Sequence, residues 1–212
     1  MTPFPKRFRN MPRPDDQFLF IMICLTGHKK RFENYARQKS TLPELAICNA
    51  ITPSDSDFDQ KCSMVNFRHD FTGRGSKGLW LSNLEVFAYF LKSTHTYLVV
   101  LEDDAIIPGG LRSSLLTQHV VHPKFLALGG TRLGQYASCN LYNKACVKNI
   151  LSAIRSHPID RNADHYFSNV CCPGYMREVP YNVMGLEGLG IPAIAKVDQE
   201  ISKESMRSQH DE

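Results

Sequence analysis

Three consecutive carboxylates, Glu102, Asp103 and Asp104, follow an apolar stretch that ends at Leu101. Ligands of open α/β sheets bind beyond the carboxyl ends of strands. Crowded carboxylates repel one another unless a cation neutralises them. The triplet therefore indicates a site for Mn2+ or Mg2+, with phosphate oxygens completing the coordination. The alternative is that these acids cap the next helix or face solvent.

The elements that would position the triplet follow from the alternation of apolar and polar segments. Strands are predicted at Phe18–Leu25, Leu45–Ala50, Tyr97–Leu101 and Lys124–Leu128, and helices at His28–Lys39, Gly78–Thr94 and Tyr142–Ser156. The segment from Thr52 to Lys77, rich in Ser, Asp, Gly and Lys, is expected to be a long irregular loop kept for function. This order predicts a single α/β domain with a mainly parallel central sheet flanked by helices.

Length and composition fit one globular domain. The chain has 212 residues, of which 42% are hydrophobic, which is enough to form a real core. The formal net charge of +4, from 25 basic and 21 acidic side chains, argues against a nucleic-acid partner. We expect a basic, proline-rich arm at residues 1–17, the domain at 18–195 and a polar tail at 196–212.

The seven cysteines and the longest apolar run indicate the cellular compartment of the protein. The cysteines are irregularly spaced, without a C-x-x-C pair, which is typical of a reducing compartment. The run from Phe18 to Leu25 is far shorter than the roughly 20 residues of a membrane-spanning helix, and no small-residue cleavage site follows it. We therefore expect a cytoplasmic protein that contacts a membrane peripherally through its basic arm. The polar end would suit a linker within a longer multidomain protein.

Several segments together resemble glycosyltransferase family 25, which includes lipooligosaccharide and collagen galactosyltransferases. The segments are Gly78-Leu-Trp-Leu-Ser-Asn-Leu-Glu-Val-Phe87, Tyr97-Leu-Val-Val-Leu-Glu-Asp-Asp-Ala-Ile-Ile107, Phe125-Leu-Ala-Leu-Gly-Gly130, Tyr136-Ala-Ser-Cys-Asn-Leu-Tyr-Asn-Lys-Ala145 and Pro158-Ile-Asp-Arg-Asn-Ala-Asp164. Their order and spacing cover most of the chain. The sequence departs from the family pattern at Leu79, Asn83 and Phe87, where the family has a cysteine, a histidine and a tryptophan.

The resemblance implies a GT-A fold and a metal-dependent enzyme that transfers a hexose, galactose or glucose, from a UDP-sugar with inversion. The acceptor would be a glycan or glycoprotein. Asp104 is then the expected metal ligand. Asp103 is expected to face the ribose or donor sugar, and Glu102 the nucleotide or a metal-bound water.

Inversion requires a carboxylate that takes the proton of the acceptor hydroxyl. The resemblance of Pro158–Asp164 to a family segment makes Asp164 the first candidate and Asp160 the second. Asp160 could equally be a helix cap after Pro158. Thr26 and Arg31 follow the first predicted strand and Ala50 ends the second, so all three are expected to contact the donor. Arg31 could equally be a solvated helix residue, and Ala50 a core residue. Trp80 is expected to be a core residue rather than a sugar-stacking one.

Two other functions remain open from the sequence. A sugar nucleotidyltransferase also uses acidic pairs with Mg2+, but it would be expected to carry a glycine-rich phosphate loop, which His28–Arg31 resembles only in charge. A catalytically inactive glycan-binding module with the same fold is the other alternative, because Asn83 replaces the family histidine.

Overall fold

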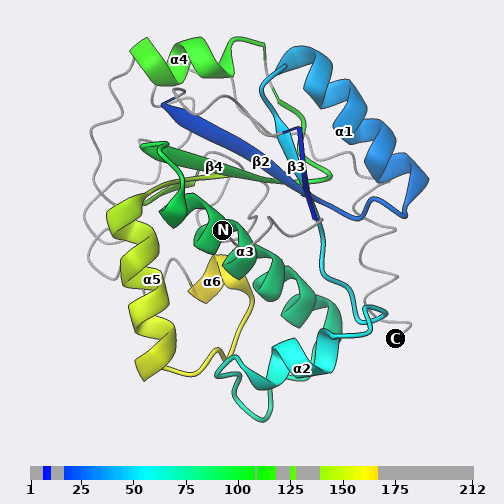
Figure 1. Cartoon of the computed structure of the whole chain (residues 1–212), viewed down its shortest axis with the longest axis vertical. Helices are drawn as coiled ribbons and strands as arrows, with labels where there is room; N and C mark the ends of the chain where they lie inside the picture. Colours follow the sequence, from blue (N-terminus) through cyan, green and yellow to red (C-terminus); the bar gives the residue numbers. More distant parts are fainter. Residues whose placement is uncertain (1–6, 11–16, 108, 118–124, 128–138, 167–212) are drawn as a thin grey trace.

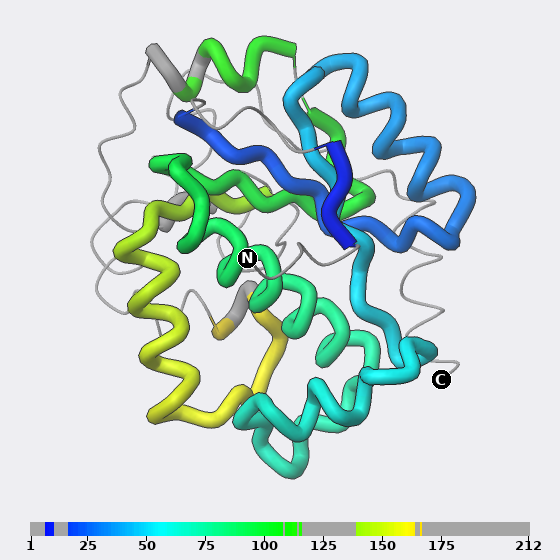
Figure 2. The backbone as a smooth tube through the Cα atoms, viewed as in Figure 1, coloured from blue at the N-terminus to red at the C-terminus, as the bar shows by residue number. Residues whose placement is uncertain are grey.

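The computed structural model of the chain describes residues 7–10, 17–107, 109–117, 125–127 and 139–166. These residues form one mixed α/β domain around a six-stranded sheet of order β1-β3-β2-β4-β6-β5. The strands are β1 (Phe8–Arg9), β2 (Phe18–Cys24), β3 (Ala46–Asn49), β4 (Tyr97–Glu102), β5 (Phe125–Ala127) and β6 (Cys139–Asn143). The path of the backbone through these strands can be followed in Figure 2.

The sheet is mixed, whereas the sequence predicted a mainly parallel one. β2 pairs in parallel with both β3 and β4, but β1–β3, β4–β6 and β5–β6 are antiparallel. The parallel part therefore consists of β3, β2 and β4. Each of these strands is reached from the one before through a helical connection, as parallel pairing requires.

Helices cover both faces of the sheet (Figure 1). They are α1 (Lys29–Thr41), α2 (Phe58–Ser63), α3 (Arg74–Lys92), α4 (Leu111–Thr117), α5 (Lys144–Ser156) and α6 (Ala163–Tyr166). α1 and α4 lie on one face, and α3, α5 and α6 lie on the other. Because α3 leads directly into β4, its amino end lies at the edge of the sheet where β2 and β4 end.

The strand β2 explains why both faces need a cover. All of its residues are buried, without polar alternation, as expected for a central strand. Its residues alternate between two clusters: Phe20 and Met22 pack with Tyr35 of α1, while Ile21 packs with Phe87 of α3. Two separate apolar layers thus hold the helices on the sheet.

Two predicted segments differ from the structure. The segment from Thr52 to Lys77 is not a continuous irregular loop, since it contains α2 and the first turn of α3. Tyr142 was expected in a helix, but it belongs to β6, and the helix α5 begins one residue after Asn143. The Asn143 side chain accepts a hydrogen bond from Cys146 N at 2.8 Å and so acts as the N-cap.

Among the described residues, no helix combines the length and the apolar character needed to cross a membrane. Cys24, Cys48, Cys62, Cys139 and Cys146 are free thiols. The predicted tail at 196–212 lies outside the described residues.

Candidate functional site

The acidic triplet lies where β4 ends and the chain turns. Glu102 is the last residue of β4, and Ala105 N donates to Glu102 O at 3.1 Å to close a turn. The strict alternation of side chains in an extended strand therefore ends at Glu102. Asp103 is buried, whereas Asp104 is partly exposed. The three acids consequently have different surroundings.

Asp103 is the anchored member of the triplet. One carboxylate oxygen accepts a hydrogen bond from Leu25 N at 2.8 Å, and the other is held by the guanidinium of Arg31. The side chains of Arg31 and Asp103 are only 7% and 5% exposed. Asn34 donates to Asp103 O at 2.8 Å and to Ala105 O at 3.0 Å, which fixes the turn to α1. Asp103 was expected to face the ribose or donor sugar, but both of its carboxylate oxygens already have hydrogen-bond partners within the protein.

Burial and neighbouring charge have opposite effects on the acids. Burial raises the pKa of Asp103, while the positive charge of Arg31 lowers it. Burial also raises the pKa of Asp104, and the nearby negative charge of Asp103 raises it further. Asp104 therefore holds its negative charge at an energetic cost that a cation bound beside it would reduce.

A pocket of about 290 Å³ opens at this edge of the sheet. It is formed by the ends of β2 and β4, the first turn of α1, the segment after β3 and the beginning of α3. Of the residues predicted to contact the donor or metal, the pocket brings together Arg31, Ala50, Glu102, Asp103 and Asp104. Thr26 is not among its described lining residues.

Two charged atoms beside the pocket lack partners. Asp104 Oδ1 and Arg31 Nη2 are both buried, and within the part of the chain that the structure describes neither has a hydrogen-bond partner. A buried polar atom without a partner is costly and rare in native proteins. Because both residues line the pocket, a ligand with a cationic and an anionic part would complement the pair.

The segment after β3 is held tightly against α3. Ile51 N donates to the hydroxyl of Ser82 at 2.8 Å, and the same hydroxyl donates to Gly78 O at 2.8 Å. A Cβ atom at Gly78 would lie 2.4 Å from Ile51 O. Only glycine therefore permits this approach, which places Gly75 and Leu79 of α3 in the pocket wall.

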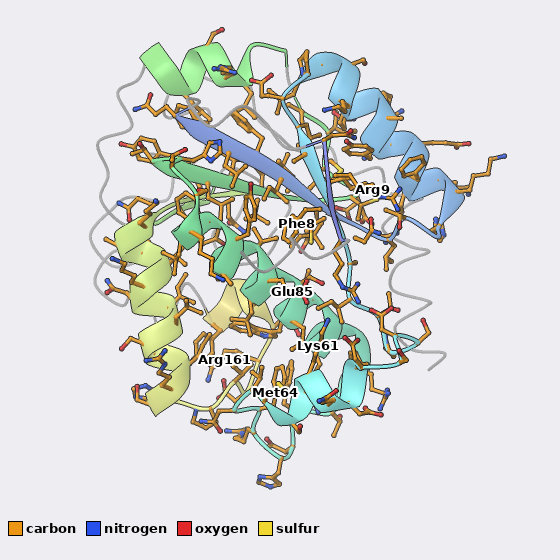
Figure 3. All side chains as sticks on the ribbon, viewed as in Figure 1. Phe8, Arg9, Lys61, Met64, Glu85 and Arg161 are labelled. Atoms are coloured by element: carbon orange, nitrogen blue, oxygen red, sulfur yellow. The ribbon has the colours of Figure 1, made fainter. Side chains whose placement is uncertain are left out.

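The amino-terminal arm also contacts the pocket segment. Arg7 donates to Ala50 O at 3.2 Å and to Asp55 Oδ2 at 2.8 Å, and Asp55 Oδ2 accepts from Thr52 N at 3.1 Å. Arg7 Nε also lies 3.8 Å from Glu85 of α3, which pairs with Lys61 of α2 at 2.9 Å (Figure 3). Arg7 thus joins the arm to the residues that line the pocket.

Glu102, Asp103 and Asp104 are the carboxylates that the described pocket lining offers to a metal. Within residues 7–10, 17–107, 109–117, 125–127 and 139–166, no group of three or more His, Cys, Asp or Glu side chains could hold a metal ion. Asp104, with its unpartnered oxygen, nevertheless fits a Mg2+ or Mn2+ that takes one or two protein carboxylates and completes its coordination with phosphate and water.

Of the two predicted catalytic acids, Asp160 is not among the described residues that line the pocket. Asp160 precedes α6 and accepts hydrogen bonds at 2.7 and 2.8 Å from Arg161, which is labelled in Figure 3. Its pKa is lowered, chiefly by these bonds. Asp164 is the second residue of α6, and its side chain lies outside the described part of the structure.

Two further sequence expectations concern α3. Trp80 is fully buried, and its indole donates to Arg161 O at 2.9 Å, which confirms the core interpretation. Asn83 is also buried, and its amide donates to Leu79 O at 2.9 Å within its own helix.

Some pocket residues were not singled out from the sequence. Thr52 and Ser54 line the pocket, as does Gly75, and Arg7 holds the segment that contains Thr52. The Gly73-Arg74-Gly75 spacing before an apolar helix was the available signal, because glycines near a helix start often permit close approach of a ligand. No signal in the sequence indicated the role of Arg7.

A comparison with models of known protein families finds no match, and a comparison with curated proteins finds none.

Proposed function

We propose that the chain is a metal-dependent, inverting glycosyltransferase of GT-A type. The reaction transfers a hexose, galactose or glucose, from a UDP-sugar to a hydroxyl of a glycan or glycoprotein. The resemblance to family 25 supports the proposal, together with one structural observation. Asp104, with an unpartnered buried oxygen, lines the same pocket as the buried guanidinium of Arg31.

This charge arrangement suits a nucleoside diphosphate leaving group. Negative charge builds up on the diphosphate as the bond to the sugar breaks, and preorganised positive groups stabilise it. Arg31 contributes a guanidinium that its bond to Asp103 holds in place. A Mn2+ or Mg2+ ion bound at Asp104 would supply Lewis-acid stabilisation of the same leaving group.

The acceptor hydroxyl needs a base. Asp160 is the weaker candidate, because its hydrogen bonds with Arg161 lower its pKa and therefore its basicity. Asp164 remains the first candidate from the sequence. Its position in α6, which packs against α3, makes it the residue to substitute first.

Calorimetric titration of UDP into the protein, with Mn2+ and with EDTA, tests the proposal. We expect Mn2+-dependent binding that Asp104→Asn weakens by at least about tenfold, because a carboxylate ligand of the metal is lost. Asp70→Asn is the matched control, since Asp70 is an exposed acid paired with Arg68 and does not line the pocket. Release of UDP from UDP-galactose or UDP-glucose, with and without glycan acceptors, then identifies the donor.

A second candidate is the inactive glycan-binding module. Two observations favour it: Asp103 is already held by Arg31 and Leu25 N, and Asn83 is bonded within its own helix. Glycan binding that is unaffected by EDTA, without UDP binding, would support the module and contradict the enzyme. Formation of a UDP-sugar from UTP and a sugar phosphate would instead support a sugar nucleotidyltransferase.

A further inference from the structure

We infer that the amino end of α3 is the phosphate-binding part of the pocket, with Gly75 as its contact residue and Arg31 as a second donor. The inference deepens the proposed function and rests on it for the nature of the anion, a phosphate group of the donor nucleotide. It assigns a role to a backbone segment that carries no acidic or metal-binding residue.

The first observation is the open start of α3. Its first internal hydrogen bond runs from Lys77 N to Gly73 O at 3.0 Å, so the N–H groups of the residues between them have no acceptor within the helix. Gly73, the N-cap, has no side-chain cap, and the first turn contains no acid. A 19-residue helix that begins in this way attracts anions.

The second observation is independent of the helix and concerns Arg31. Its side chain is only 7% exposed and lines the same pocket as Gly75. Its Nη2 is buried and lacks an acceptor among the residues that the structure describes. An arginine presents several N–H groups in a planar fork that matches phosphate oxygens. A phosphate between α3 and Arg31 would therefore give both sets of donors a partner.

The distribution of charge in the pocket favours different positions for the phosphate and the metal. Glu102, Asp103 and Asp104 outnumber Arg31, so this part of the pocket favours a cation. The wall formed by α3 has no acid in its first turn, and Gly75 has no side chain to cover the backbone. We therefore place the phosphate at α3 and a divalent cation at Asp104, with the ligand joining the two.

The substitution Gly75→Asp tests this assignment. It puts a carboxylate at the second position of α3, where an acid favours the helix and opposes a bound anion. Gly75 does not have a positive φ, so a side chain can be accommodated by the backbone. Gly75→Ala controls for side-chain size. Ala145→Asp controls for charge, because Ala145 is the exposed second residue of α5 and lies outside the pocket lining.

The ligand for the titration is Mg2+-pyrophosphate, which contains the proposed cation and phosphates but no nucleoside. We expect binding to the wild-type protein, a loss of affinity of about tenfold or more in Gly75→Asp from charge repulsion, a smaller loss in Gly75→Ala, and a change below about twofold in Ala145→Asp. Absence of binding to the wild-type protein, or equal affinity in Gly75→Asp, would overturn the inference.

A parallel titration with Mg2+-UDP separates this inference from the proposed function. If UDP binds no more tightly than pyrophosphate while Gly75→Asp weakens both, the phosphate site stands and the nucleotide-sugar function fails. If UDP binds tightly and Gly75→Asp has no effect, the function stands and the phosphate site is wrong.

Discussion

The guanidinium of Arg31 and the carboxylate of Asp103 form a buried ion pair at the carboxyl edge of the sheet. The two residues are 72 positions apart in the sequence, and the pair connects the first turn of α1 to the turn after β4. Leu25 N adds a third contact from the end of β2. Three segments that form the pocket are thus held by one carboxylate.

Removal of Arg31 tests the contribution of this pair to stability. Arg31→Met leaves Asp103 buried without its partner, and we expect the free energy of unfolding at pH 7.5 to fall by about 3 kcal/mol. Urea denaturation followed by circular dichroism measures the loss. Arg155→Met, at an exposed site in the last turn of α5, is the control and should cost about 0.5 kcal/mol or less.

The cost of Arg31→Met should depend on pH. Without the lowering effect of Arg31, the pKa of Asp103 in the folded variant lies further above its unfolded value. The folded variant then binds a proton more readily than the unfolded chain. Its stability therefore falls as the pH rises from the unfolded to the folded pKa of Asp103. We expect a smaller difference from wild type at pH 5 than at pH 7.5. An equal difference at both pH values would contradict this account of the pair.

Asp104→Asn should separate stability from ligand binding. Because burial and the charge of Asp103 raise the pKa of Asp104, its ionised form opposes folding. We expect the variant to be at least as stable as wild type at pH 7 in urea denaturation. The advantage should shrink as the pH falls through the raised pKa of Asp104, because the wild-type carboxylate then becomes protonated. A marked loss of stability at pH 7 would instead show that Asp104 makes a structural contact.

Gly78→Ala tests the close approach of α3 to the segment after β3. The added methyl group would meet Ile51 O, a backbone atom that cannot rotate away, so we expect a loss of about 2 to 3 kcal/mol. Alanine's higher helix propensity offsets only part of this loss. Gly109→Ala is the control, since no atom lies within 4 Å of the corresponding Cβ position. Thermal unfolding of both variants gives the comparison.

Arg7→Gln tests whether the arm positions the pocket. We expect a stability loss of about 1 kcal/mol or less, because the ion pairs are partly exposed. We expect UDP affinity to fall by about threefold to tenfold, since the segment from Ala50 to Asp55 loses its anchor. Arg9→Gln, two residues further along the arm at an exposed position, should change neither quantity. Recovery of affinity in Arg7→Lys would distinguish a positioning charge from simple packing.

The local features of the fold could be predicted because they depend on nearby residues. The sequence indicated β2, α1 and β4 to within two residues of their observed ends, since each has an uninterrupted apolar or amphipathic pattern. It missed β6, because the short strand Cys139–Asn143 is followed directly by the helix α5, and the two have different spacings of apolar residues. Antiparallel pairing of β6 with β4 is a tertiary property that no local pattern specifies.

In the candidate site, too, features that depend on nearby residues could be predicted, and features that depend on tertiary contacts could not. The acidic triplet indicated the edge of the sheet at which the pocket lies, because acids after a buried strand lie at its carboxyl end. The different environments of Asp103 and Asp104 could not be predicted, since they depend on Arg31 and Leu25, which are 72 and 78 positions from Asp103 in the sequence. The contacts of Arg7 are likewise distant in the sequence, which is why composition alone suggested only a basic arm.

The short strand β1 determines whether the chain can be shortened at its amino end without aggregating. Phe8 and Arg9 pair with Cys48 and Ile47, and so cover the outer edge of β3. Removing residues 1–17 would leave the backbone amides and carbonyls of that edge open to strands of other molecules. Such a truncated protein would be prone to aggregate, even though most of the hydrophobic core remains. β1 therefore shields this edge of the sheet from other strands.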